Sequence, residues 1–249
     1  MAQTAILSLA CGVAAERRVA SDVKMLPPLA GIGAADPRIR VDPEQGPWRA
    51  VGKLQAGALN LRVLCTATLI GPATVLTAAH CLYNPRTRYA FVPGSLHFLI
   101  GYAGGRYAGH AVGVRIKIGD GYDPERPRQT IGSDWALVTL DEPPDAADRA
   151  LPVLREPPET QARVMLGGYQ QDHPLILMAD THCRIEGRVA DASGRTLLRH
   201  NCAGTHGVSG APLLIESDGR WAVAAIDVAA ETGAEGGLAV MPGAAANGF

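Results

Sequence analysis

The sequence lacks any apolar run of the roughly 18 residues that a membrane-spanning helix needs. Its longest apolar stretch, Ala5–Ala15, is too short to cross a bilayer. It also lacks an excess of charge of one sign, since 23 lysine and arginine residues are matched by 24 acidic residues. Nucleic-acid-binding domains usually carry a basic excess or a basic stripe, and neither is present. We therefore expect no membrane anchor and no nucleic-acid partner.

Long runs of Ala, Glu, Lys and Leu with a helical period are also missing. Glycine (29 residues) and proline (18 residues) are abundant instead, which favours a turn-rich β protein over a helical bundle. Hydrophobic residues make up 47% of the chain and charged residues 19%. This composition supplies a core and excludes disorder as the overall state.

The N-terminal residues suggest export. Ala5–Ala15 has the length of a signal-peptide hydrophobic region and ends in the small residues Val-Ala-Ala, although residues 1–4 carry no positive charge. We predict a signal peptide at residues 1–15, with a disordered or helical tail as the alternative. Residues 16–45 are then a leader or propeptide-like arm outside the core, and the protein is secreted or periplasmic.

The cysteine count agrees with export. The five cysteines stand at positions 11, 65, 81, 183 and 202, and removal of the first leaves an even number that could form two disulfides. Free thiols in a cytosolic protein are one alternative. A zinc site is another, although the spacing of its candidate ligands is irregular: His182, Cys183, His200, Cys202 and His206.

From about Pro47 onward, around a dozen short apolar runs alternate with turn residues, which predicts one or two antiparallel barrels. Val112–Ile118 alternates with a period of two and predicts a half-buried strand. Asp191–Gly194 and Ser217–Gly219 predict hairpin turns. The proline-rich stretch at Glu142–Asp145 predicts the joint between an N-terminal half, residues 46–144, and a C-terminal half, residues 145–249.

Three separate segments carry the residue types of a nucleophilic triad. They hold His80 (in Thr-Ala-Ala-His-Cys), Asp134 (in Asp-Trp-Ala-Leu) and Ser209 (in Gly-Val-Ser-Gly-Ala-Pro). A serine hydroxyl needs a histidine to take its proton, and a buried carboxylate to orient that histidine. The glycines around Ser209 allow the amides of Gly207 and Ser209 to face a developing oxyanion. Each segment alone could be structural, but together they predict catalysis.

These motifs resemble those of the trypsin/chymotrypsin-like serine proteases, and Pro47-Trp48 is similar to the start of that family's first barrel. The resemblance implies an all-β fold of two six-stranded antiparallel β-barrels, with the active site in the cleft between them. It also implies that His80 is the general base, Asp134 its orienting carboxylate, Ser209 the nucleophile, and Gly207 and Ser209 the oxyanion donors.

The resemblance also implies two disulfides, Cys65–Cys81 around the histidine and Cys183–Cys202 in the second barrel. Val208 stands where animal members of the family carry an aspartate that receives the freed N-terminus. The pattern is therefore closer to the bacterial branch that resembles glutamyl endopeptidases.

Ala203, Thr205 and Asp227 are the predicted substrate pocket. Glutamyl endopeptidases carry a histidine at about the position of Asp227, where it recognises an acidic side chain. An aspartate there favours arginine or lysine by charge pairing. The alternative is that Asp227 faces solvent or caps a turn.

The sequence thus predicts an exported, monomeric serine endopeptidase that hydrolyses polypeptides through an acyl-enzyme, without a metal or cofactor. A catalytically silent binding protein on the same scaffold and an esterase are the alternatives.

Overall fold

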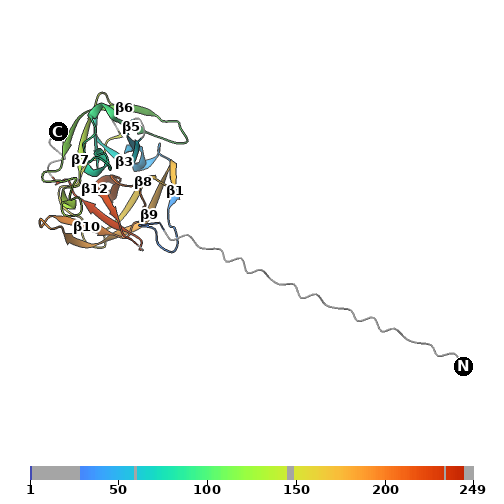
Figure 1. The fold of residues 1–249 in the computed structure, drawn as a ribbon. Coiled ribbons are helices and arrows are strands. Elements are labelled where there is room, and N and C mark those ends of the chain that lie inside the picture. Colours follow the sequence, from blue (N-terminus) through green and yellow to red (C-terminus); the bar gives the residue numbers. More distant parts are fainter. Residues whose placement is uncertain (2–28, 59–60, 145–148, 233, 244–249) are drawn as a thin grey trace.

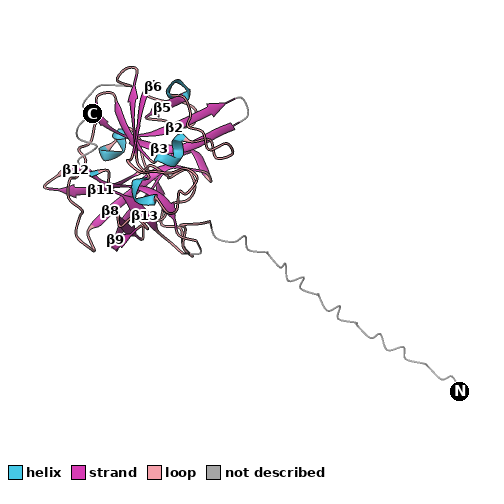
Figure 2. Cartoon of the chain, turned by 60° about the vertical axis from the view of Figure 1, so that its left-hand side comes forward, coloured by secondary structure: helices cyan, strands magenta, loops and turns pink. Residues whose placement is uncertain are grey.

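The computed structural model describes residues 1, 29–58, 61–144, 149–232 and 234–243. The predicted signal peptide and the start of the predicted arm, residues 2–28, lie outside this description. Strands dominate the fold, and in the described residues helical structure is confined to short 3-10 helices (Figure 2). Among the described residues, no helix has the length and apolar character needed to cross a membrane.

The N-terminal half forms a closed antiparallel barrel in the spatial order β2-β3-β4-β7-β6-β5. Large apolar side chains that are completely or almost completely buried fill it, among them Leu54, Leu76, Phe98 and Leu137. Its strands are β2 (Val51–Ala58), β3 (Leu61–Gly71), β4 (Thr74–Thr77), β5 (Leu96–Ile100), β6 (Gly109–Ile118) and β7 (Ala136–Leu140).

The C-terminal half has the strand order β9-β10-β13-β12-β11-β8, and β8 pairs again with β9, which joins the two ends of this order. Figure 1 shows the two halves as adjacent units, with β5, β6 and β7 above and β8, β9 and β10 below. The predicted double-barrel fold is confirmed. The strands are β8 (Arg163–Gln170), β9 (His173–Ala190), β10 (Thr196–His200), β11 (Pro212–Ser217), β12 (Arg220–Ala230) and β13 (Gly237–Val240).

Both predicted hairpin turns are present in the second barrel. Asp218 and Gly219, with φ values of 52° and 71°, link β11 to β12. Two successive residues with positive φ match the right-handed twist of the strands they connect, and Asp-Gly accepts this conformation at low cost. Gly194, with φ 79°, completes the turn between β9 and β10.

The alternating segment of β6 forms the predicted strand, but one of its apolar residues faces outward. Val114 is 56% exposed. The pairing register with β7 shifts between Gly113 and Arg115. Such a bulge adds a residue on one strand and changes which side chains face the core. Simple alternation therefore fails at this position.

The expectation that the arm lies outside the core is wrong for its described part, residues 29–45. β1 (Ile39–Arg40) pairs with β9, and Ile32 and Arg38 are each only 7% exposed. These contacts are with strands far along the chain, so the local composition of the arm does not reveal them. The predicted boundaries at residues 46 and 144 stay predictions, and residues 145–148 lie outside the described part of the chain.

Candidate active site

His80 and Asp134 are brought together by two neighbouring strands of the first barrel. His80 lies in the 3-10 helix η2 (Ala79–Leu82) directly after β4, and Asp134 lies directly before β7. Thr77 of β4 pairs with Ala136 of β7, so the two segments start from adjacent positions. His80 Nδ1 lies 2.6 Å from Asp134 Oδ2, and the backbone N–H of His80 donates to Asp134 Oδ1 at 2.8 Å.

The surroundings favour a charged imidazolium at His80. Asp134 is 3% exposed, whereas the His80 side chain is 33% exposed. Burial by itself would lower the pKa of His80, but the charge of Asp134, its hydrogen bond and the charge of Asp227 outweigh burial and raise that pKa. Because Nδ1 faces a carboxylate, it carries the proton in the neutral ring, which leaves Nε2 with a lone pair that can accept a proton.

Ser209 lies in the loop between β10 and β11, held tightly against the first barrel. Its carbonyl accepts the Thr66 amide at 3.0 Å, and the Gly210 amide donates to the Asp227 carbonyl at 2.8 Å. Gly210 has φ +81°, and a Cβ there would lie 2.3 Å from Thr77 Oγ1. Only glycine satisfies both constraints, so this residue sets how closely the loop can approach.

The amides predicted to bind an oxyanion are available. Within the described chain, neither the Gly207 amide nor the Ser209 amide donates to a protein acceptor. The Gly207 carbonyl oxygen accepts a hydrogen bond from Thr66 Oγ1 of the first barrel at 3.0 Å. Two N–H groups of one loop that have no acceptor among the described residues are a suitable donor pair for a tetrahedral oxyanion.

His80, Asp134 and Ser209 line one cleft of about 530 Å³, and Thr205 and Asp227 line it as well. In the described residues no hydrogen bond joins the Ser209 hydroxyl to the His80 ring. Catalytic hydrogen bonds are often long or poorly aligned before substrate binds, so a missing Ser209–His80 hydrogen bond is compatible with proton transfer between these two residues. Ala203 is fully buried, with its amide donating to Asp180 Oδ2 at 3.0 Å, and does not line the cleft.

A buried histidine accompanies Asp227. His200 Nε2 lies 3.1 Å from Asp227 Oδ1, and His200 Nδ1 accepts the Cys202 amide at 3.2 Å. Since Nδ1 accepts, Nε2 carries the ring proton and donates it to Asp227 Oδ1. In the sequence His200 was only a candidate zinc ligand. Nothing in its local pattern indicates the contact, because the partner lies on another strand.

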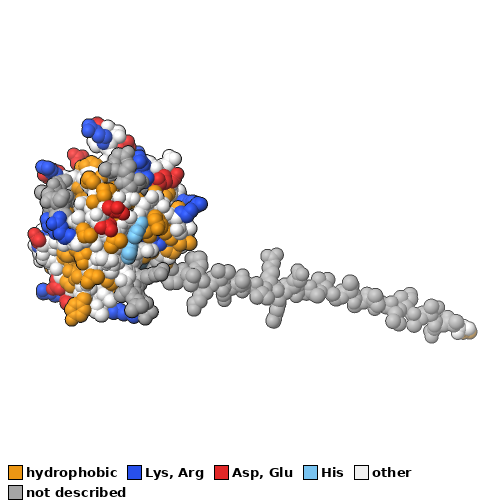
Figure 3. Space-filling view, turned by 90° about the horizontal axis from the view of Figure 1, so that it is seen from above, with side chains coloured by type: hydrophobic (Ala, Val, Ile, Leu, Met, Phe, Trp, Pro, Cys, Tyr) orange, Lys and Arg blue, Asp and Glu red, His pale blue; other side chains and the backbone are white. Residues whose placement is uncertain are grey.

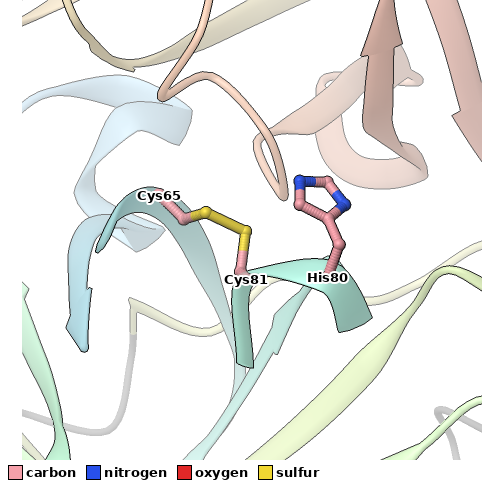
Figure 4. A group of neighbouring side chains, drawn as sticks. All are labelled: Cys65, His80 and Cys81. Carbon is pink, nitrogen blue, oxygen red and sulfur yellow. A yellow bond between two sulfur atoms is a disulfide. The ribbon is translucent and has the colours of Figure 1, made fainter. Parts of the chain in front are cut away.

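Both disulfides implied by the resemblance, Cys65–Cys81 and Cys183–Cys202, are present. Figure 4 shows the first beside His80, with the two sulfur atoms bonded to each other. The potential ligand atoms of these three residues lie within 4.8 Å of one another. A sulfur in a disulfide is not a thiolate, so neither cysteine pair offers the ligands that zinc takes from cysteine.

On the face drawn in Figure 3, lysine and arginine side chains are interspersed with aspartate and glutamate. This mixed distribution agrees with the balanced composition of the chain. No single sign of charge dominates that view.

Comparison with known proteins gives a match to the Trypsin family model over residues 39–241. A solved Glu endopeptidase is similar in structure, with a TM-score of 0.70 and 17% identity, over 87% of this chain and 95% of that chain. The thermostable serine protease AL20 from an extremophilic microorganism has a TM-score of 0.61 and 18% identity, over 80% and 94%. Protease Anisep from Arthrobacter nicotinovorans has a TM-score of 0.60 and 15% identity, over 78% and 90%.

Proposed function

Because the chain belongs to the trypsin family and is a serine-type endopeptidase, we propose that His80, Asp134 and Ser209 are its catalytic triad. The observation that carries this assignment is the double contact between His80 and Asp134 beside the cleft that Ser209 also lines. The substrate is a polypeptide, as for the family.

The proposed reaction begins when Ser209 Oγ attacks the carbonyl carbon of the scissile peptide while His80 Nε2 takes its proton. The amides of Gly207 and Ser209 donate to the resulting oxyanion, and the buried carboxylate of Asp134 stabilises the imidazolium. His80 then gives the proton to the leaving amine. Water repeats the sequence on the acyl-enzyme and releases the acid product.

We also propose a preference for arginine or lysine before the cleaved bond. Two features of the cleft support it: the Asp227 carboxyl group lines it and is 3% exposed, and Thr205 Oγ1, fully buried, has no hydrogen-bond partner among the described residues. A carboxylate shielded from water pairs strongly with a guanidinium or ammonium group, and a free hydroxyl can accept a second hydrogen bond from it.

For localisation and assembly, we propose a secreted or periplasmic monomer. The two disulfides support an oxidising compartment, because cytosolic thiols are kept reduced.

Covalent labelling with a fluorophosphonate, followed by peptide mapping, tests the triad. We expect the label on Ser209 in the wild type and its near disappearance in His80→Ala. Ser217→Ala, which removes an exposed hydroxyl at the end of β11, is the control and labels like the wild type. A folded wild type that takes no label is a binding protein on the protease scaffold. Hydrolysis of a small ester but of no denatured protein identifies an esterase.

A further inference from the structure

Arg38 lies in the predicted N-terminal arm, yet its guanidinium is buried beside the second barrel. Its side chain is 1% exposed. Asp36 Oδ2 and Asp172 Oδ2 accept hydrogen bonds from Nη2 at 2.8 and 2.6 Å. Nη1 donates to the side-chain oxygen Oε1 of Gln170 at 2.5 Å. The two carboxylates thus hold the guanidinium in one orientation, with one of its nitrogens directed at Gln170.

Gln170 connects this guanidinium to the loop that carries Ser209. It is fully buried at the end of β8, and the same Oε1 atom accepts the backbone N–H of Thr205 at 2.9 Å. Thr205 begins the turn toward the nucleophile, since its carbonyl accepts the Val208 amide at 3.0 Å. One side-chain oxygen of Gln170 therefore accepts hydrogen bonds both from the arm, at Arg38, and from the loop that carries Ser209, at Thr205.

A second contact from the arm reaches the neighbouring residue of the loop. The Gly204 amide donates to the Gly31 carbonyl at 3.2 Å. Two successive amides of the loop, at Gly204 and Thr205, are therefore held by the arm, the first directly and the second through Gln170.

We propose that Arg38 is a positioning residue for the oxyanion amides of Gly207 and Ser209, acting through the side chain of Gln170. A guanidinium only donates hydrogen bonds. It can therefore bond to the Gln170 carboxamide only when the oxygen Oε1 faces it. In the opposite orientation, the Gln170 NH2 group would face both Arg38 and the Thr205 N–H. Arg38 thereby keeps an acceptor under the loop.

The residue before Ser209 in the loop offers no charge of its own for such a contact. Val208 is 2% exposed and carries no charge, so the loop has no carboxylate at this position to pair with a buried amine. The buried guanidinium of Arg38 supplies a charge-assisted contact from the N-terminal side instead. It needs no newly formed chain terminus.

The inference rests on the proposed triad, and steady-state kinetics on variants of the full chain test it. Arg38→Met and Gln170→Leu remove the two ends of the contact, while Gln170→Glu keeps an acceptor for both donors. We expect kcat to fall about 10- to 100-fold in the first two, with KM nearly unchanged, because oxyanion contacts form in the transition state. Gln170→Glu should retain most of the wild-type kcat, because its carboxylate still accepts from Arg38 and from the Thr205 N–H. The acid limb of the pH profile stays in place, since the His80–Asp134 pair is untouched.

Arg149→Met is the matched control. Arg149 is also an arginine with a largely inaccessible side chain, 8% exposed, and it pairs with an arm residue, Glu44, at 3.0 Å. Glu44 lies beside Gly101, directly after β5 of the first barrel. Rates are normalised to the folded fraction measured by thermal unfolding. The inference is overturned if Arg38→Met and Gln170→Leu keep wild-type kcat, or lose no more than Arg149→Met. Wild-type activity in Ser209→Ala, measured in the same series, would instead overturn the proposed triad.

Discussion

The carboxylate of Asp134 binds His80 at two points, the ring nitrogen Nδ1 at 2.6 Å and the backbone N–H at 2.8 Å. One oxygen is used for each contact. The backbone contact fixes the main chain that carries the imidazole, and the ring contact fixes its rotation and tautomer. The carboxylate is almost completely buried, so water does not compete for either contact.

The first prediction concerns this pair. Asp134→Asn should keep the fold but reduce kcat by about 10⁴-fold, because an amide NH2 facing Nδ1 favours the wrong tautomer. Kinetics together with thermal unfolding measure it. Asp141→Asn is the control, since that exposed carboxylate accepts the backbone amides of Val112 and Glu142 and does not line the cleft. A loss of less than tenfold would argue against Asp134 as the orienting residue.

The second prediction is a pH dependence. The pKa of His80 is raised above its ordinary 6.5, so kcat/KM should rise with pH through a midpoint above that value as the ring becomes neutral. The protonated pair also stabilises the fold below pH 6.5, and this contribution is lost as pH rises through the folded-state pKa. A pH–rate profile and pH-dependent unfolding measure the two effects. A midpoint at or below 6.5 would contradict the assignment.

The third prediction concerns specificity. Asp227→Asn should reduce kcat/KM for peptides with arginine or lysine before the scissile bond by roughly 10- to 100-fold, the range expected when a hydrogen bond to a charged group is lost. Peptides with a neutral residue there should change much less. Asparagine keeps an oxygen for His200, so the buried contact survives. A peptide library in which the wild type prefers glutamate would refute this pocket assignment.

The fourth prediction compares two glycines. Gly210→Ala places a Cβ 2.3 Å from Thr77 Oγ1 and 2.4 Å from the Thr66 carbonyl, at φ +81°. We expect severe destabilisation and loss of activity. Gly219→Ala, at φ +71° with nothing within 4 Å, carries only the backbone strain and should cost about 1 kcal/mol. Urea unfolding of both variants distinguishes a steric effect from a conformational one. Equal losses would contradict the close approach at Gly210.

The fifth prediction concerns the disulfides. Replacing either pair by alanines should lower the free energy of unfolding by about 3 kcal/mol, or Tm by roughly 10 °C for a chain of this size. The two pairs should differ in activity at temperatures where both variants are folded. Loss of Cys65–Cys81, next to His80, should reduce kcat, whereas loss of Cys183–Cys202 should affect it less. Equal effects on kcat would show that the first disulfide does not hold the histidine segment in place.

Much of the fold was predictable because its signals are local. The Asp218–Gly219 turn follows from the backbone preferences of two adjacent residues. The strand at Val112–Ile118 follows from alternation, but the exposure of Val114 does not, because a bulge depends on how the neighbouring strand pairs. The segments around His80, Asp134 and Ser209 were recognisable because each keeps a short pattern of residues.

Which buried polar groups meet was decided by the tertiary structure alone. Arg38 and Gln170 are 132 positions apart, and His200 and Asp227 are 27 apart on strands that do not pair with each other. The Pro- and Gly-rich composition around the arm suggested a segment outside the core, yet Arg38 is buried there. A charged side chain can be buried only where partners satisfy it, and those partners come from distant strands. Local sequence thus determined the turns, the strands and the short motifs. Barrel closure determined which buried charged and polar side chains contact each other, because it brings distant strands together.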